Sequence, residues 1–208
     1  MISFSIVIPI FNEAENIQEL TKEIFLNLNS DYNFELILVN DCSTDNTVEI
    51  INSLKKKYSL KNINNKTNLG QSYSLLNGIK ISNFDTIVTL DGDLQNNPKD
   101  IPKLLKLYFS DKSIKLIGGI RLKRQDSIIK ILSSKIANKV RSIILNDNCN
   151  DTGCALKVFS KKIHDLKQHP GQKASARNIL KLLNNSNIVS SHKDCGKIQD
   201  PYSFRCIP

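Results

Sequence analysis

Residues 86–95 read TIVTLDGDLQ, a run of β-branched and aliphatic residues that stops abruptly at an acidic turn. This pattern predicts a buried β-strand over residues 86–90. Asp91 and Asp93 follow the strand two residues apart, so in extended backbone their side chains project to the same side, and Gly92 allows backbone or ligand to approach. With the side-chain oxygen of Gln95, these carboxylates suit Mg²⁺ or Mn²⁺, because such ions are usually held by one or two carboxylates plus ligand phosphate oxygens. For an isolated D-G-D, a solvated acidic turn is the alternative.

Two earlier stretches show the same succession of an apolar run and a polar cluster. Residues 4–10 (FSIVIPI) precede FNEAEN at 11–16, and residues 34–40 (FELILVN) precede DCSTD at 41–45. In an open parallel sheet, ligands bind in the crevice beyond the carboxyl ends of the strands. Three polar clusters at three such ends therefore predict one shared pocket.

These motifs resemble the family 2 inverting glycosyltransferases, whose nucleotide-sugar domain, the GT-A fold, carries V-I-P-x-[FY]-N-E, then V-[ND]-D-x-S-x-D-x-T, then L-D-x-D-x-Q. Here they stand as VIPIFNE (7–13), VNDCSTDNT (39–47) and LDGDLQ (90–95). The D-x-D-x-Q form, with Asn97 and Pro98 after it, is most similar to the subgroup that glycosylates polyprenyl or dolichyl phosphate. The resemblance runs from about Ser3 to Lys162. It implies metal-dependent, inverting transfer of a sugar from a GDP- or UDP-linked donor to polyprenyl phosphate.

The resemblance also implies roles for particular residues near the donor. Pro9 and Glu13 are expected beside the nucleotide, Asp41 on the nucleobase, and Gly70 where the backbone passes close to the nucleotide, with Asp91 also in contact. Seen alone, Glu13 is equally well explained as a partner of the dipole of a helix opened by residues 12–16, and Gly70 as a plain turn glycine.

The expected cation ligands are Asp91, Asp93 and Gln95, and the expected catalytic residues are Asp93 and Asp151. Asp151 begins the segment DTGCALKVF (151–159), which resembles the family's D-[TA]-G-x-x-L-K-x-F and faces the acceptor side in that family. A phosphate acceptor is already largely ionised near neutral pH, so Asp151 is expected to position it more than to deprotonate it.

The chain has 208 residues, enough to bury one sizeable core, and its formal net charge is +9. We expect an α/β fold: a mostly parallel, Rossmann-like GT-A sheet flanked by helices, C-terminally incomplete, with a short, partly helical or loose tail. Five cysteines without a C-x-x-C pair indicate neither a disulfide framework nor a zinc site. This, with no signal peptide and no apolar run of about eighteen residues, predicts a cytoplasmic protein.

Most of the excess charge lies between residues 112 and 141, where nine Lys or Arg residues accompany one acid. Arg121, Lys123 and Arg124 are candidates for binding a diphosphate or an acceptor phosphate, and a solvated basic face is an equal alternative. A predicted amphipathic helix over residues 129–143 either packs on the core or lies on an anionic leaflet, which would place the protein peripherally at the inner face of the membrane. Nucleic acid is not an expected partner, because no recognition motif is present and residues 112–141 contain no aromatic side chain.

From residue 169 onward the sequence resembles an internal piece of the histidine ammonia-lyases. Residues 191–208 read SHKDCGKIQDPYSFRCIP, and in that family the residues matching Gln199, Tyr202 and Arg205 line the substrate pocket. The Ala-Ser-Gly tripeptide that forms the lyase electrophile is absent, so lyase activity is not expected. We therefore divide the chain into a glycosyltransferase domain (1–167) and a lyase-like fragment (168–208), joined by natural fusion or by an error of gene assembly. A nucleotide-sugar binding remnant without turnover is the alternative function.

Overall fold

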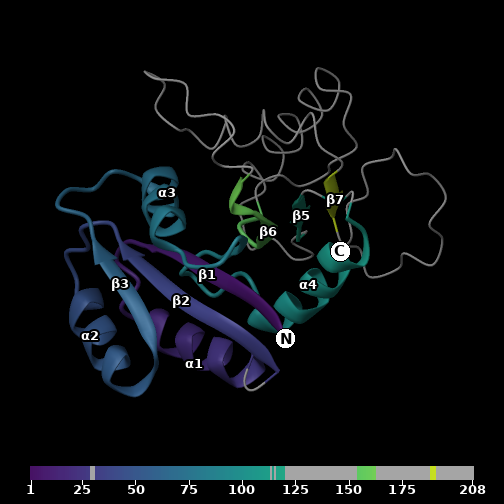
Figure 1. Ribbon diagram of the computed structural model, residues 1–208. Helices are drawn as coiled ribbons and strands as arrows, with labels where there is room; N and C mark the ends of the chain where they lie inside the picture. The colour runs from purple at the N-terminus through teal and green to yellow at the C-terminus, as the bar shows by residue number, and fades with distance from the viewer. Residues whose placement is uncertain (29–30, 113, 115, 120–153, 163–187, 191–208) are drawn as a thin grey trace, which may run out of the picture.

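The computed structural model describes residues 1–28, 31–112, 114, 116–119, 154–162 and 188–190 (Figure 1). Twelve elements lie within these ranges. In chain order they are β1 (Ile2–Ile10), α1 (Ile17–Asn27), β2 (Tyr32–Asn40), α2 (Thr47–Lys57), β3 (Leu60–Asn64), α3 (Gln71–Ile81), β4 (Thr86–Thr89), the 3-10 helix η1 (Pro98–Asp100), α4 (Ile101–Ser110), β5 (Leu116–Gly118), β6 (Lys157–Ser160) and β7 (Ile188–Ser190).

The strands form one sheet in the order β3-β2-β1-β4-β6-β5-β7. Only β6 runs antiparallel to its neighbours, β4 and β5. The parallel register pairs Ile10 at the end of β1 with Asn40 at the end of β2, and Val7 with Thr89 at the end of β4. The loops that follow β1, β2 and β4 therefore leave the same edge of the sheet, as predicted.

Alternate residues of the central strands face opposite layers of the core, because side chains of a strand point to its two faces in turn. The even-numbered residues Phe4 to Ile10 of β1 pack with α1, α2 and α4, whereas Val7 packs with Ile37 and with Ile79 of α3. Figure 1 shows α1 and α2 on one side of the sheet and α3 on the other. The predicted α/β architecture is confirmed.

Helix α3 lies close to the sheet because small residues form its buried face. Ser74 and Gly78 are buried there, and a Cβ atom on Gly78 would collide with Cγ1 of Val7 and lie 3.0 Å from Cγ2 of Val39. The sequence pattern predicts Leu75, Leu76 and Ile79 as the apolar positions of this helix. Ile79 is buried as expected, whereas Leu75 and Leu76 are only partly buried.

A partly buried hydrogen-bond network in the first three strands of the chain centres on Glu35. Its Oε1 accepts hydrogen bonds from the Ser5 hydroxyl at 2.6 Å and from the Asn83 amide at 2.5 Å, and its Oε2 lies 2.7 Å from Nζ of Lys61. Burial opposes ionisation of this carboxyl, but the hydrogen bonds from Lys61, Ser5 and Asn83 prevail and lower its pKa. Glu35 thus joins three strands and the turn before β4 at a distance from the carboxyl edge.

Most predicted elements are confirmed, with one clear correction and two additions. The first helix begins at Ile17 and not at residues 12–16, because tertiary hydrogen bonds fix the loop before it. Strands β6 and β7 were not predicted. Within the described residues no helix is both long and apolar enough to cross a membrane. The predicted helix over 129–143 lies outside the described residues, as does the proposed boundary at 167/168, and of the predicted tail only residues 188–190 are described.

Candidate active site at the carboxyl edge of the sheet

Each of the three loops at the carboxyl edge contains a residue in the left-handed backbone region. Asn12 (φ 55°), Cys42 (φ 63°) and Leu94 (φ 59°) follow β1, β2 and β4, and they are the only such non-glycine residues among those described. This conformation costs of order 1–3 kcal/mol per residue and persists where the surroundings over-determine it, commonly at functional sites. Each of the three predicted polar clusters therefore lies in a loop whose backbone conformation is held by its surroundings.

The carboxylate of Asp41, which is 3% exposed, holds the turn before α3. Its Oδ1 accepts hydrogen bonds from the Asn65 amide group at 2.7 Å and from the Leu69 N–H at 2.9 Å, and its Oδ2 accepts one from the Gly70 N–H at 2.7 Å. Gly70 adopts φ 86°, so this position favours glycine for its backbone conformation. Asp41 and Gly70, which were predicted separately, form one unit.

This environment settles the charge of Asp41. Burial opposes its ionisation, but the hydrogen bonds from Leu69, Asn65 and Gly70 outweigh burial and hold the pKa below its usual range. An ionised carboxylate offers about four acceptor positions. Three are occupied by these donors, and a hydrogen bond from the Ser74 side chain lowers the pKa further. One position at most is left for the edge of a nucleobase, so positioning the turn is the larger part of what this side chain does in the structure.

The carboxylates after β4 are partly exposed, and each accepts a hydrogen bond. Asp91 Oδ1 accepts from Nε2 of Gln71 at 2.5 Å, and Asp93 Oδ1 accepts from the Gln95 backbone N–H at 3.1 Å. Gln71 is the first residue of α3, so its bond to Asp91 connects the Asp41–Gly70 turn to the D-G-D turn. No sequence pattern predicted a role for Gln71. The only indication of such a role was its position directly after Gly70.

The donor set after β4 fits a hard divalent cation that shares its coordination with a bound phosphate. Two accessible carboxylates and one exposed amide side chain supply oxygen atoms, the ligands that Mg²⁺ accepts together with phosphate oxygens. Within the described residues no three His, Cys, Asp or Glu side chains are grouped for a metal ion, and the predicted ligand set holds only two carboxylates.

Glu13 lies against the D-G-D turn, as the predicted common pocket requires. A Cβ atom on Gly92 would lie 3.2 Å from Cγ of Glu13, so the absence of a side chain at Gly92 allows Glu13 to pack closely against this turn. Glu13 Oε2 accepts a hydrogen bond from the Asn16 amide group at 2.7 Å. Pro9 is a buried residue of β1. It lies after Val7↔Thr89, the last residue pair between β1 and β4, so its lack of an N–H costs no hydrogen bond between these two strands.

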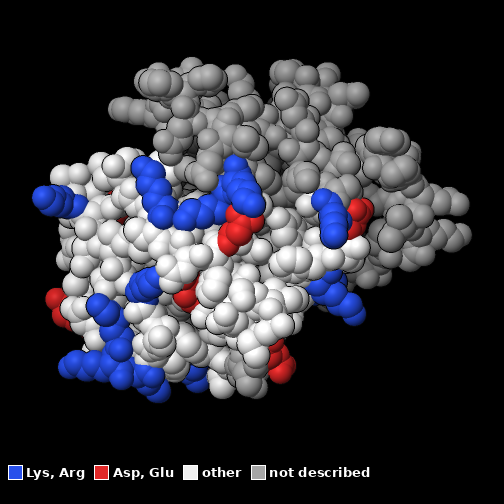
Figure 2. All heavy atoms as spheres, viewed as in Figure 1, with Lys and Arg blue, Asp and Glu red and all other residues white. Residues whose placement is uncertain are grey.

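The structure thus links Glu13, Asp41, Gly70 and Asp91 at one edge, with Asp93 and Gln95 beside them in the sequence. Arg121, Lys123, Arg124 and Asp151 lie outside the described residues. Figure 2 shows separate groups of basic side chains on the described surface, and one group lies over α2, whose last turn carries Lys55, Lys56 and Lys57. Cations at that position are favoured by the helix dipole and need no ligand to explain them.

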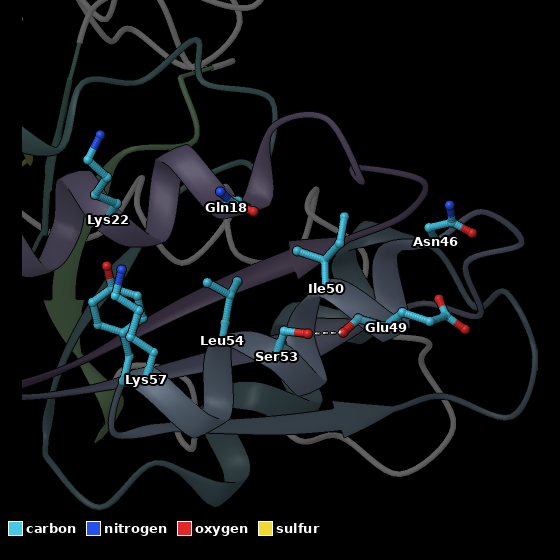
Figure 3. Close-up of a pocket in the computed structure, with 9 residues that line it drawn as sticks. Gln18, Lys22, Asn46, Glu49, Ile50, Ser53, Leu54 and Lys57 are labelled. Carbon is cyan, nitrogen blue, oxygen red and sulfur yellow. Dashed lines mark hydrogen bonds between the residues drawn. The ribbon is translucent and has the colours of Figure 1, made fainter.

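Two grooves lie away from this edge. One of about 600 Å³ separates α1 from α2 and is lined by Gln18 and Lys22 of α1 and by Glu49 and Lys57 of α2, among others (Figure 3). Figure 3 also shows the Ser53 hydroxyl donating to the Glu49 carbonyl within α2, at 3.1 Å. The other groove, of about 650 Å³, lies between the amino ends of β1 and β2 and helix α4. Neither includes a predicted site residue.

Comparison with known proteins identifies a curated relative. Undecaprenyl-phosphate 4-deoxy-4-formamido-L-arabinose transferase of Pseudomonas syringae pv. syringae is 33% identical over 165 residues, which cover 77% of this chain and 48% of that protein. The chain therefore spans about half the length of this curated relative. A family model described as aromatic amino acid lyase matches residues 133–208.

Two solved structures share the fold. TarS 1-349 of S. aureus superposes with a TM-score of 0.60 at 20% identity, covering 89% of this chain and 55% of that one. Glucosyl-3-phosphoglycerate synthase of Mycobacterium tuberculosis, solved with Mn²⁺, UDP and glucosyl-3-phosphoglycerate, superposes with a TM-score of 0.61 at 18% identity, covering 77% and 57%. The family model for glycosyl transferase family 2 matches residues 5–166, most of the chain and all three loops of the site. This protein accordingly belongs to glycosyl transferase family 2.

Proposed function

We propose that the protein is a metal-dependent, inverting glycosyltransferase that moves a sugar from a nucleotide-diphosphate sugar to polyprenyl phosphate. The observation that carries the donor half is the chain of contacts from Asp41 through Gly70 and Gln71 to Asp91, which joins the predicted base side of the pocket to the predicted cation side. The curated relative is named for transfer to undecaprenyl phosphate, and one structural neighbour holds Mn²⁺ and UDP, which supports both halves of the proposal.

Each loop has a proposed part in donor binding. The turn held by Asp41 and ending at Gly70 receives the nucleoside, with Pro9 and Glu13 beside it. Asp91, Asp93 and Gln95 would hold Mg²⁺ or Mn²⁺ against the diphosphate. When bound, the cation neutralises charge that develops on the departing nucleoside diphosphate.

The acceptor half of the proposal rests on the sequence. A phosphate oxygen of the acceptor attacks the anomeric carbon from the side opposite the donor diphosphate, whose bond to that carbon breaks with its electron pair on oxygen. Because the acceptor phosphate is already an anion, no strong base is needed. Arg121, Lys123 and Arg124 would bind phosphates, Asp151 would orient the acceptor, and Asp93 would act at the reacting centre. The net charge of +9 suits peripheral association with the anionic cytoplasmic face of a membrane.

The test is a two-part assay on the full chain. Binding of UDP and GDP is measured by calorimetry with Mn²⁺, with Mg²⁺ and with EDTA, and nucleoside diphosphate release is then measured from UDP- and GDP-linked sugars with undecaprenyl phosphate. Cation-dependent binding followed by lipid-dependent release is expected. Binding without release would support the alternative of a nucleotide-sugar binding remnant, and absence of binding to either nucleotide would overturn both.

A further inference from the structure

The loop that follows β1 is fastened to the loop that follows β2 by side chains of the S-T-D-N-T segment at residues 43–47. Three successive backbone N–H groups donate to it. The Asn12 N–H donates to the Ser43 hydroxyl at 2.9 Å, the Glu13 N–H to the Thr47 hydroxyl at 2.9 Å, and the Ala14 N–H to Asp45 Oδ2 at 3.2 Å. A bond in the opposite direction runs from the Thr44 N–H to Oδ1 of Asn12 at 2.8 Å.

Asp45 also acts on this set of hydrogen bonds indirectly, because it fixes the orientation of the Thr47 hydroxyl. Its Oδ1 accepts the Thr47 hydroxyl proton at 2.5 Å and the Thr47 N–H at 3.1 Å. Because the threonine has a single hydroxyl proton and gives it to Asp45, its oxygen lone pairs remain to accept the Glu13 N–H. Glu13, Thr47 and Asp45 thus form a directional hydrogen-bond chain, in which each bond polarises the next.

A plain helix cap is the simplest alternative role for Asp45. The bond from the Thr47 N–H is a local Asx turn at the start of α2, and it requires nothing outside that helix. It leaves unexplained the bond from Ala14, which lies 31 residues earlier in the chain, and the fact that Thr47 is fully buried against Glu13. A cap also does not explain why Asn12 stays at φ 55°, whereas the bond that its N–H donates to the Ser43 hydroxyl and the bond that its Oδ1 accepts from the Thr44 N–H do.

We propose that Asp45 and Thr47 are positioning residues that hold the loop from Asn12 to Ala14, and with it Glu13, in the geometry that binds the nucleotide. The role of Glu13 in this proposal rests on the proposed function. The hydrogen bonds between residues 43–47 and the loop from Asn12 to Ala14, which we call the latch, are observed in the structure. Neither residue needs to touch the donor. Each acts through the backbone of the β1 loop.

The sharpest variant is Asp45→Asn. An asparagine oxygen can keep the local Asx turn with Thr47, but its NH₂ group then faces the Ala14 N–H, so the cross-loop bond is lost while the cap is kept. Thr47→Val removes the hydroxyl that accepts from Glu13 at nearly constant volume, and Thr47→Ser restores it. Glu35→Gln is the matched control, because it alters a partly buried carboxylate network of similar size away from the carboxyl edge.

Two measurements on the full chain test the latch. The first is amide hydrogen exchange of residues 11–16, which needs no ligand, and the second is the affinity for UDP and GDP with Mn²⁺. For Thr47→Val, which loses a partly buried hydrogen bond, we expect exchange about tenfold faster and affinity about tenfold weaker. For Asp45→Asn, which loses the exposed bond from the Ala14 N–H, we expect changes of about threefold in the same directions. Glu35→Gln should leave both within about twofold while lowering the melting temperature, and Thr47→Ser should stay near the wild type.

The outcomes separate the latch from the proposed function. If Asp45→Asn and Glu35→Gln change exchange and affinity equally, the effect is general destabilisation and the latch is refuted. Faster exchange in Asp45→Asn with unchanged nucleotide affinity would likewise overturn the positioning role. If the wild type binds neither nucleotide, the proposed function fails, and the exchange of residues 11–16 still decides whether Asp45 holds the loop.

Discussion

Replacing Asp41 by asparagine should destabilise the fold by an amount that the contacts of its carboxylate define. If the amide oxygen keeps the bonds from Asn65 and Leu69, its NH₂ group faces the Gly70 N–H, which now has no acceptor. A hydrogen bond to a charged group contributes roughly 1.5–3 kcal/mol, and leaving a buried donor unsatisfied costs a similar amount. Allowing for overlap between these two estimates, we expect a loss of about 2–4 kcal/mol from a total stability of order 5–15 kcal/mol.

Urea unfolding of the wild type and of Asp41→Asn, measured at several pH values, tests this reasoning. The folded-state pKa of Asp41 is lowered, so its stabilisation is present above the pKa of about 3.9 in the unfolded chain and is lost as pH falls through the folded-state pKa. The difference between the two proteins should therefore be constant near neutral pH and shrink in acid. A difference below about 1 kcal/mol at pH 7, or one that grows on acidification, would refute the assignment of Asp41 as the residue that holds the turn.

Three further expectations concern the cation site, the sheet and the tail. Asp91→Asn and Asp93→Asn should each abolish Mn²⁺-dependent UDP or GDP binding in calorimetry without loss of the folded circular-dichroism spectrum, and unchanged affinity in both would remove the metal assignment. Gly78→Ala should lower stability to urea by about 1–3 kcal/mol, because its methyl group meets the buried Val7 side chain, and a gain in stability would contradict that packing. A chain ending at Lys167 should keep its nucleotide affinity and lose only a few degrees in melting temperature by differential scanning calorimetry, whereas global unfolding would show that the tail is structurally required.

The fold was predictable where the cause of structure is local. The apolar runs of β1, β2 and β4 end at polar turns, and the buried positions Ile17, Leu20 and Ile24 recur at helical spacing. The start of α1 was missed because Asn12 is bound by residues of another loop, which no local pattern reports. Ser74 and Gly78 on the buried face of α3 were missed for a different reason, since small residues give no hydrophobic signal, yet they permit a close approach to the sheet.

The candidate site divides in the same way. Residues that end strands were found from the sequence, because a parallel register brings strand ends to one edge whatever the intervening segments are. Gln71 and Asn65 were missed because their roles depend on contacts across the loops, such as the bond from Gln71 to Asp91 over 20 residues. From the sequence, Asp45 can be assigned only a local role near the start of α2, because its bond to Thr47 is local and its bond to Ala14 is not.

The two family matches overlap in sequence, and the strand pairing of β6 shows which sheet this part of the chain joins. The glycosyl transferase match ends at residue 166 and the lyase match begins at residue 133, so β6 lies in both. β6 is inserted between β4 and β5, with Val88 opposite Val158 and Ile117 opposite the same residue, and Thr89 donates its hydroxyl to the Ala155 carbonyl at 2.6 Å. A strand hydrogen-bonded on both sides within the sheet that carries the D-G-D turn belongs structurally with the glycosyltransferase. Among the described residues, β7 by contrast pairs only with β5 at the outer edge, so we expect that removing it exposes one strand edge and leaves the carboxyl-edge loops in place.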